Sequence, residues 1–122
     1  MKILLTGATG FLGKNIMSHM RQHDHDVVGI GSDVYVLRCQ QACRKVIEYY
    51  KPEVIIHAAG SVGGILANKM APGQFMYDNL IMGANMIERS RQLGVSKFIL
   101  LGTVCSYPKL SKIPFNEEDI WK

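Results

Sequence analysis

The chain has no long hydrophobic run: its 122 residues contain no window of the ~18 unbroken apolar residues that a membrane span needs. Its N-terminus has no basic region followed by a cleavage site, so a secretory signal is not expected. Cysteine is scarce, and Cys39, Cys43 and Cys105 have neither the number nor the spacing of a disulfide framework or a zinc site. These absences predict a cytoplasmic protein with reduced thiols, no membrane segment and no metal site.

Charge of one sign is not concentrated anywhere in the sequence. Lys and Arg number 14 against 10 Asp and Glu, a formal net charge of +4, but the basic residues are scattered singly. The sequence therefore has no basic stripe of the kind that binds nucleic acid, and its charge suits a small anionic ligand. With 48% hydrophobic residues the chain can bury the core of one domain, although it is short for an enzyme that also carries a substrate lobe.

Three glycines follow an apolar stretch at residues 2–6, at the spacing Gly7-x-x-Gly10-x-x-Gly13, and a helical pattern comes next. Gly7 allows a sharp turn, Gly10 allows the backbone to approach phosphates, and Gly13 allows the helix to pack closely on the strand. The N–H groups at the start of that helix would face the anion. A plain turn before a helix is the alternative, but the preceding strand and the following helix favour a dinucleotide pyrophosphate site.

Apolar segments and amphipathic segments alternate along the rest of the chain. Strands are predicted at residues 26–30, 34–37, 54–57 and 97–102, and helices from Gly13 to about residue 20, at 42–50 and at 72–93. This alternation predicts a parallel sheet in a doubly wound α/β fold of the Rossmann type. Ligands of such folds bind beyond the carboxyl ends of the strands, where the polar clusters 6–13, 31–33, 58–64 and 102–107 are all predicted to lie, so we expect one shared site.

The helix at residues 72–93 has apolar residues around more than one face, including Phe75, Leu80 and Ile87. Such a helix is buried on two sides, one against the sheet and one against another surface. A second copy of the chain is the natural partner, so we expect a homodimer through this helix.

The residues at the end of the second predicted strand indicate whether the cofactor is NADP or NAD. An acidic residue that grips the ribose 2′-hydroxyl would lie there, but the sequence has Gly31 and Ser32, and Asp33 comes two residues late. A small neutral pair leaves room for a 2′-phosphate, so NADP is favoured and NAD is possible. In the alternative, Asp33 still reaches the ribose or simply caps the turn.

Residues 102–107 bring three hydroxyls and a thiol to the end of a strand. Thr103 or Ser106 could donate to a carbonyl that becomes an alkoxide, and Cys105 could exchange protons. By composition alone, such side chains are more often core-edge residues whose polar groups are satisfied by the backbone. His57, at the end of a buried strand, is interpreted as a hydrogen-bonded structural imidazole, and the His-Asp-His-Asp run at 23–26 as a solvated turn.

The sequence resembles the extended short-chain dehydrogenase/reductases of the nucleotide-sugar epimerase/dehydratase group, most closely the GDP-L-fucose synthases. The similarity spans nearly the whole chain. It is carried by TGATGFLG at 6–13, HAAG at 57–60, VGGILAN at 62–68 and GTVCSYPK at 102–109. The segments at 62–68 and 102–109 favour fucose synthases over generic sugar epimerases.

The resemblance implies a nucleotide-sugar substrate, GDP-4-keto-6-deoxy-mannose, which is epimerised at C3 and C5 and then reduced by NADPH. It assigns Thr103 to the substrate carbonyl and Cys105 to proton transfer. The resemblance and the glycine pattern together give the cofactor contacts as Gly7, Thr9, Gly10, Phe11, Leu12, Ser32, Ala58, Ala59, Gly60 and Asn79. Substrate contacts are expected from Val62, Gly63, Gly64 and Asn68.

The chain departs from the family pattern in three places. None of its five tyrosines has a lysine four residues on, so the family's Tyr-x-x-x-Lys pair is absent. Val36 stands where an aspartate usually contacts adenine, and Ser32 where an arginine can meet the 2′-phosphate. Residues 1–122 are therefore expected to form an incomplete dinucleotide-binding domain, without the substrate lobe and without efficient turnover alone. The alternatives are an epimerase or dehydratase for another nucleotide sugar, and a non-catalytic nucleotide-binding or dimerisation module.

Overall fold

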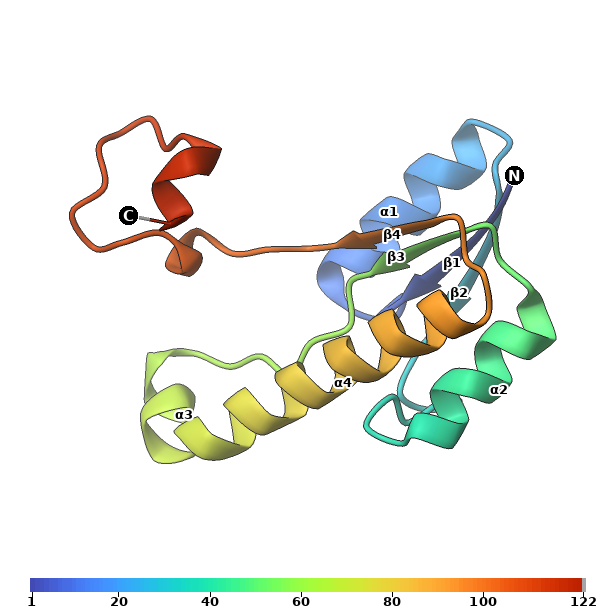
Figure 1. Ribbon diagram of the computed structural model, residues 1–122, viewed down its shortest axis with the longest axis horizontal. Helices are drawn as coiled ribbons and strands as arrows, with labels where there is room; N and C mark the ends of the chain where they lie inside the picture. The colour runs from blue at the N-terminus through green and yellow to red at the C-terminus, as the bar shows by residue number, and fades with distance from the viewer. Residues whose placement is uncertain (122) are drawn as a thin grey trace.

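Four parallel strands form the centre of the molecule, in the order β2-β1-β3-β4, with helices on both faces (Figure 1). The computed structural model describes residues 1–121. The elements are β1 (Lys2–Thr6), α1 (Phe11–Gln22), β2 (Asp26–Ile30), α2 (Gln40–Tyr50), β3 (Val54–His57), α3 (Ile65–Met70), α4 (Pro72–Gln92) and β4 (Lys97–Leu100), followed by two 3₁₀ helices at Val104–Ser106 and Glu117–Trp121.

The central strands β1 and β3 are apolar because both of their faces are covered. Successive strand residues point to opposite faces, so Leu4 contributes to one core and its neighbours Ile3 and Leu5 to the other. Leu4 is also the register partner of Val28 in β2 and Ile55 in β3. A continuous apolar run therefore becomes a strand buried on both sides, as the sequence predicts.

The two cores lie on either side of this sheet. On one face α1 packs Ile16, Met17 and Met20 against β1 and β3. On the other face α2 and α4 lie side by side, and Val46 and Met86 are completely buried there (Figure 1). The predicted doubly wound α/β fold is confirmed, and α4 matches the helix predicted at 72–93.

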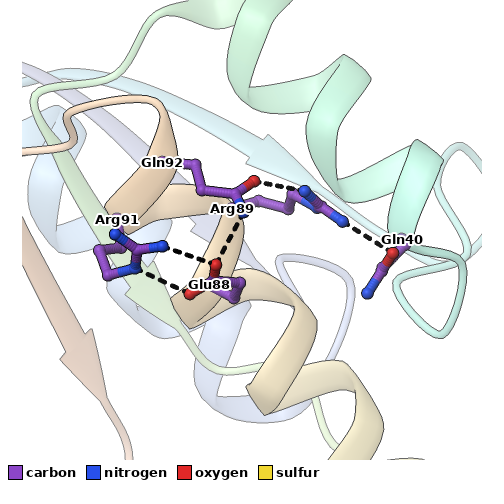
Figure 2. Close-up of polar contacts among 5 residues, drawn as sticks. All are labelled: Gln40, Glu88, Arg89, Arg91 and Gln92. Carbon is purple, nitrogen blue, oxygen red and sulfur yellow. Dashed lines mark hydrogen bonds and ion pairs between the residues drawn. The ribbon is translucent and has the colours of Figure 1, made fainter.

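A series of polar contacts joins the first residue of α2 to the last turn of α4. Arg89 donates to Gln40 across the two helices over 2.7 Å and also to Gln92 (Figure 2). Glu88 accepts from Arg91 in two bonds of 2.8 and 2.9 Å. Glu88 and Arg91 both lie on α4 and both are solvent-exposed, so their ion pair contributes little to stability. The two helices are held together mainly by the apolar core between them.

The prediction of a strand at 34–37 is wrong, because this segment forms turns. The N–H groups of Val34 and Tyr35 both donate to the Gly31 carbonyl, and Cys39 N–H donates to the Val36 carbonyl. These backbone groups are used within the turns. The apolar residues that suggested a strand serve a different purpose, because Leu37 anchors the turn in the core between β2 and α2.

Two further segments differ from the predicted pattern. The short helix α3 follows the glycine-rich loop, where no helix is predicted, and its Ile65, Leu66 and Met70 are exposed. β4 ends at Leu100 instead of residue 102, and the chain then runs past the edge of the sheet and away from it (Figure 1). Residues 101–121 therefore contribute no strand to the sheet.

Candidate functional site

The loop between β1 and α1 has the shape that its three glycines predict. Gly7 adopts a left-handed backbone with φ of 70°, and a Cβ there would lie 2.6 Å from the Ala58 carbonyl. A Cβ on Gly13 would lie 2.0 Å from the Gly7 carbonyl oxygen, so α1 can approach the loop only with glycine at this position. No side chain caps the start of α1, which leaves its first N–H groups free to bind an anion.

A buried pair fixes the ends of β1 and β3 beside this loop. Thr6 Oγ1 and His57 Nδ1 are joined by a hydrogen bond of 2.8 Å, and the Ala59 N–H donates to the same hydroxyl over 3.2 Å. Burial lowers the pKa of His57 below its ordinary value of 6.5, so the neutral imidazole is favoured. The structural role predicted for His57 is confirmed.

The loop after β3 is held by an asparagine on α4. Asn79 accepts from the Ser61 N–H at 2.7 Å and donates to the Ser61 carbonyl at 2.9 Å. Asn68 on α3 donates to the carbonyls of Gly63 and Gly64 at 2.9 and 3.1 Å. The two amide side chains therefore fix the course of the loop from both helices.

A cavity of about 470 Å³ opens where the loops after β1, β2 and β3 meet. β1 has β2 on one side and β3 on the other, so this is the point at which the strand order reverses and at which doubly wound folds bind ligands. The cavity is lined by Gly7, Thr9, Gly10, Ile30, Gly31, Ser32, Tyr35, Val36, Leu37, Arg38, Ala58, Ala59, Gly60, Ser61, Asp78 and Met82.

The far wall of the cavity contains an ion pair between the turn segment and α4. Arg38 Nη1 lies 3.1 Å from Asp78 Oδ2, and the Asp78 side chain is only 7% exposed. Asn85 of α4 also donates to the carbonyls of Leu37 and Arg38, at 3.2 and 3.0 Å. Cys43 donates its thiol to the Leu37 carbonyl, and burial raises its pKa to about 11, so it is a structural thiol. The wall is therefore tied to both helices beneath it.

This geometry can be compared with known proteins. The profile of the NAD dependent epimerase/dehydratase family matches residues 3–121. The chain belongs to that family. It is 40% identical over 109 residues to a GDP-L-colitose synthase of Yersinia pseudotuberculosis, covering 89% of this chain and 35% of that protein. It is 39% identical over 117 residues to a GDP-L-fucose synthase of Sinorhizobium fredii, covering 96% and 37%.

The solved structures agree with the sequence comparison. A GDP-mannoheptose C4 reductase from Campylobacter jejuni with NADP bound superposes with a TM-score of 0.89 at 28% identity, covering 98% of this chain and 38% of that one. The chain thus spans little more than a third of the length of the relatives it matches. Within residues 1–121 no helix is both long and apolar enough to cross a bilayer, and no three His, Cys, Asp or Glu side chains are grouped to hold a metal ion.

Most of the residues that were predicted to bind the cofactor lie together in the structure. The cavity lining contains the predicted contacts Gly7, Thr9, Gly10, Ser32, Ala58, Ala59 and Gly60. Phe11 and Leu12 lie in the first turn of α1 and are exposed, and Asn79 lies behind the loop that it holds.

The predicted substrate and catalytic residues lie outside the cavity lining. Val62, Gly63, Gly64 and Asn68 continue the loop into α3. Thr103 and Cys105 are exposed in the segment beyond β4, one strand farther from β1 than the loop 58–64. Three of the four polar clusters therefore meet, and the fourth, at 102–107, is separated because β4 is the edge strand.

Sequence reasoning missed the pair Arg38 and Asp78, which line the cavity. Arg38 directly follows the segment 34–37, which was predicted as a strand, and Asp78 lies in a helix whose apolar residues were the basis of its prediction. A signal was present: Asp78 and Met82 are four residues apart, so they share a helix face, and a carboxylate on a face that also packs in the core needs a cationic partner.

His57 predicts a pH dependence of stability. Because its pKa is lower in the folded protein than in the unfolded chain, the unfolded chain binds a proton first as the pH falls below about 6.5, and stability is lost in that direction. We expect the free energy of unfolding to fall between pH 7 and pH 5 by up to about 1.4 kcal/mol per pH unit. In His57→Gln this contribution should vanish, whereas exposed His25→Gln should keep it. Urea unfolding at several pH values measures both, and equal slopes in the two variants would contradict the assignment.

Proposed function

We propose that this chain is the NADP-binding part of an enzyme that epimerises and reduces a GDP-linked 4-keto sugar, as a GDP-L-fucose synthase does. The observation that carries the proposal is the cavity at the strand reversal point, where the glycine loop, the turns after β2 and the loop after β3 meet. The family supports a nicotinamide cofactor, and the NADP-bound reductase among the structural neighbours supports NADP, with NAD possible.

Each wall of the cavity suits one part of the dinucleotide. The free N–H groups of α1 and the open backbone at Gly10 would hold the diphosphate. The turns at 31–38 would surround the adenosine. Ala58, Ala59 and Gly60, whose small side chains leave space beside β3, would face the nicotinamide half. When bound, the cofactor supplies hydride for the reduction step.

Thr103 and Cys105 are the proposed catalytic residues. Thr103 Oγ1 accepts a hydrogen bond from the Cys105 N–H at 3.2 Å, so its own proton remains available to a substrate carbonyl. A carbonyl polarised in this way has more acidic neighbouring C–H bonds, at which an exposed thiol such as Cys105 could exchange protons, and it accepts hydride more readily. Val62, Gly63, Gly64 and Asn68 are proposed to contact the sugar nucleotide. We propose that turnover also needs a tyrosine donor with its lysine, so that residues 1–122 bind the cofactor without efficient catalysis.

The exposed face of α4 supports a homodimer. Met76, Tyr77, Leu80 and Ile87 lie on this helix and are exposed, while Met86 is buried on its other side. A second copy of the helix would cover these apolar side chains symmetrically.

Specificity for another nucleotide sugar is the alternative to the GDP-L-fucose synthase reaction. The colitose synthase and the fucose synthase are equally similar to the chain, so the comparison favours neither substrate.

The proposal is tested by titrating the purified protein with NADPH and NADH while following nicotinamide fluorescence. Saturable binding of NADPH is expected. Gly10→Val should abolish it without unfolding the protein, because a Cβ there meets only the Gly7 carbonyl oxygen, at 3.3 Å, but projects into the phosphate site. Gly73→Val, where a Cβ meets nothing within 4 Å, is the matched control and should bind normally. Absence of saturable binding to either nucleotide would overturn the proposed function.

A further inference from the structure

A second cavity adjoins the first one, between α1 and the edge strand β2. Its volume is about 680 Å³, and Thr9 and Gly31 line both cavities. The two spaces therefore share a wall at the carboxyl end of β2, where the ribose of a bound adenosine would lie. The remaining lining residues are Ala8, Lys14, Met17, Ser18, Arg21, Gln22, Gly29, Asp33 and Val34.

The second cavity contains two cations that no ion pair uses. Lys14 and Arg21 both line it, and neither is among the ion pairs formed within residues 1–121. Lys14 is close to the shared wall, because it lies in the first turns of α1 and its N–H donates to the Gly10 carbonyl at 3.0 Å. Arg21 lies seven residues farther on, about 10 Å along the helix axis.

One carboxylate lies at the same end of the cavity. A Cβ on Gly31 would be 2.5 Å from Asp33 Oδ1 and 2.7 Å from Thr9 Cγ2, so the Asp33 side chain folds back over Gly31 toward the glycine loop. A carboxylate in this position accepts a hydrogen bond from a ribose hydroxyl and repels a phosphate. Ser32, the position expected to meet a 2′-phosphate, carries no charge, and neither does Thr9 on the shared wall.

We infer that Lys14 is the residue that recognises the 2′-phosphate of an adenosine ribose, and that Asp33 opposes it. The inference rests on the proposed function, because it places the adenosine in the first cavity. The ammonium group of Lys14 attracts the phosphate dianion, whereas Asp33 favours an unphosphorylated ribose. The preference of the protein for NADP over NAD is then the balance between these two side chains across the shared wall.

Binding of 2′,5′-ADP and 5′-ADP, measured by calorimetry at low salt, separates this role from the rest of the site. In Lys14→Gln the affinity for 2′,5′-ADP should fall roughly tenfold, the loss of one charge-assisted contact, while the affinity for 5′-ADP stays within about twofold. Lys14→Arg should retain most of the binding. Arg21→Gln removes the same charge from the distant end of the cavity and should change neither affinity by more than about twofold. Asp33→Asn should strengthen 2′,5′-ADP binding selectively.

The outcomes distinguish the two proposals. If the parent protein binds both nucleotides and Lys14→Gln weakens both equally, or neither, the inference is overturned and the proposed function stands. If Arg21→Gln has the same effect as Lys14→Gln, the recognition is a general field effect and the assignment to Lys14 is wrong. If the parent binds neither nucleotide, the proposed function fails and the inference fails with it. Circular dichroism of each variant verifies that it is folded.

Discussion

Replacing Gly13 with alanine is expected to destabilise the protein by about 3 kcal/mol and to abolish nucleotide binding. The added Cβ would lie 2.0 Å from the Gly7 carbonyl oxygen and 2.7 Å from Ala8 Cα. All of these neighbours are backbone atoms, so no side chain can rotate to make room. The helix must move away from the loop, which shifts the N–H groups proposed to hold the diphosphate. Urea unfolding and an NADPH titration measure the two effects.

Gly83→Ala is the matched control for this substitution. Gly83 also lies in a helix, but a Cβ there meets nothing within 4 Å. Alanine is a better helix former than glycine, so this variant should gain about 0.5–1 kcal/mol of stability. Normal stability of Gly13→Ala, or an equal change in both variants, would show that close packing of α1 on the loop is not required.

Arg38→Gln is expected to destabilise the protein by about 2 kcal/mol. The variant leaves the Asp78 carboxylate, whose side chain is 7% exposed, without its charged partner. A buried charge that loses its partner is costly, although Arg38 is itself half exposed, which reduces the effect below that of a fully buried pair. The midpoint of urea unfolding measures the loss, and nucleotide affinity reports on the cavity wall.

Two variants make this expectation sharp. Arg44→Gln breaks the exposed pair between Arg44 and Glu48 on α2 and should cost at most about 0.5 kcal/mol. The double variant Arg38→Gln with Asp78→Asn removes both charges of the buried pair and should recover part of the lost stability, because no unpaired carboxylate remains. Additive losses in the double variant would show that the two side chains act independently.

The fold was predictable where the pattern of apolar residues reflects burial directly. The segments 26–30 and 54–57 form strands with the predicted bounds, because each is an apolar run paired in the parallel sheet. The segment 34–37 misled because Leu37 is buried from within a turn, which gives the same alternation as a strand. α3 was missed because its apolar residues face solvent and no side chain caps its start.

The candidate site was predictable only in part. The glycine spacing predicted the loop at 7–13 because two of its positions have no room for a Cβ. A side chain on Gly7 would clash with the Ala58 backbone, and one on Gly13 would clash with the Gly7 backbone. The helix face of Asp78 indicated that its carboxylate needs a cationic partner, but Arg38 could not be predicted as that partner. The two residues lie 40 positions apart, and their meeting depends on how the turn packs on α4. The roles of Thr103 and Cys105 rest on the family resemblance and stay predictions.

The Thr6 hydroxyl has a consequence for how a ligand is received. Through its bonds to His57 and to the Ala59 N–H, it couples the ends of two neighbouring strands, and Asn79 couples the second of these loops to α4. The loops that would surround the dinucleotide are therefore pre-organised. When a ligand binds in this cavity, the protein loops lose little backbone entropy because they are already ordered. More of the contact energy is therefore available as affinity.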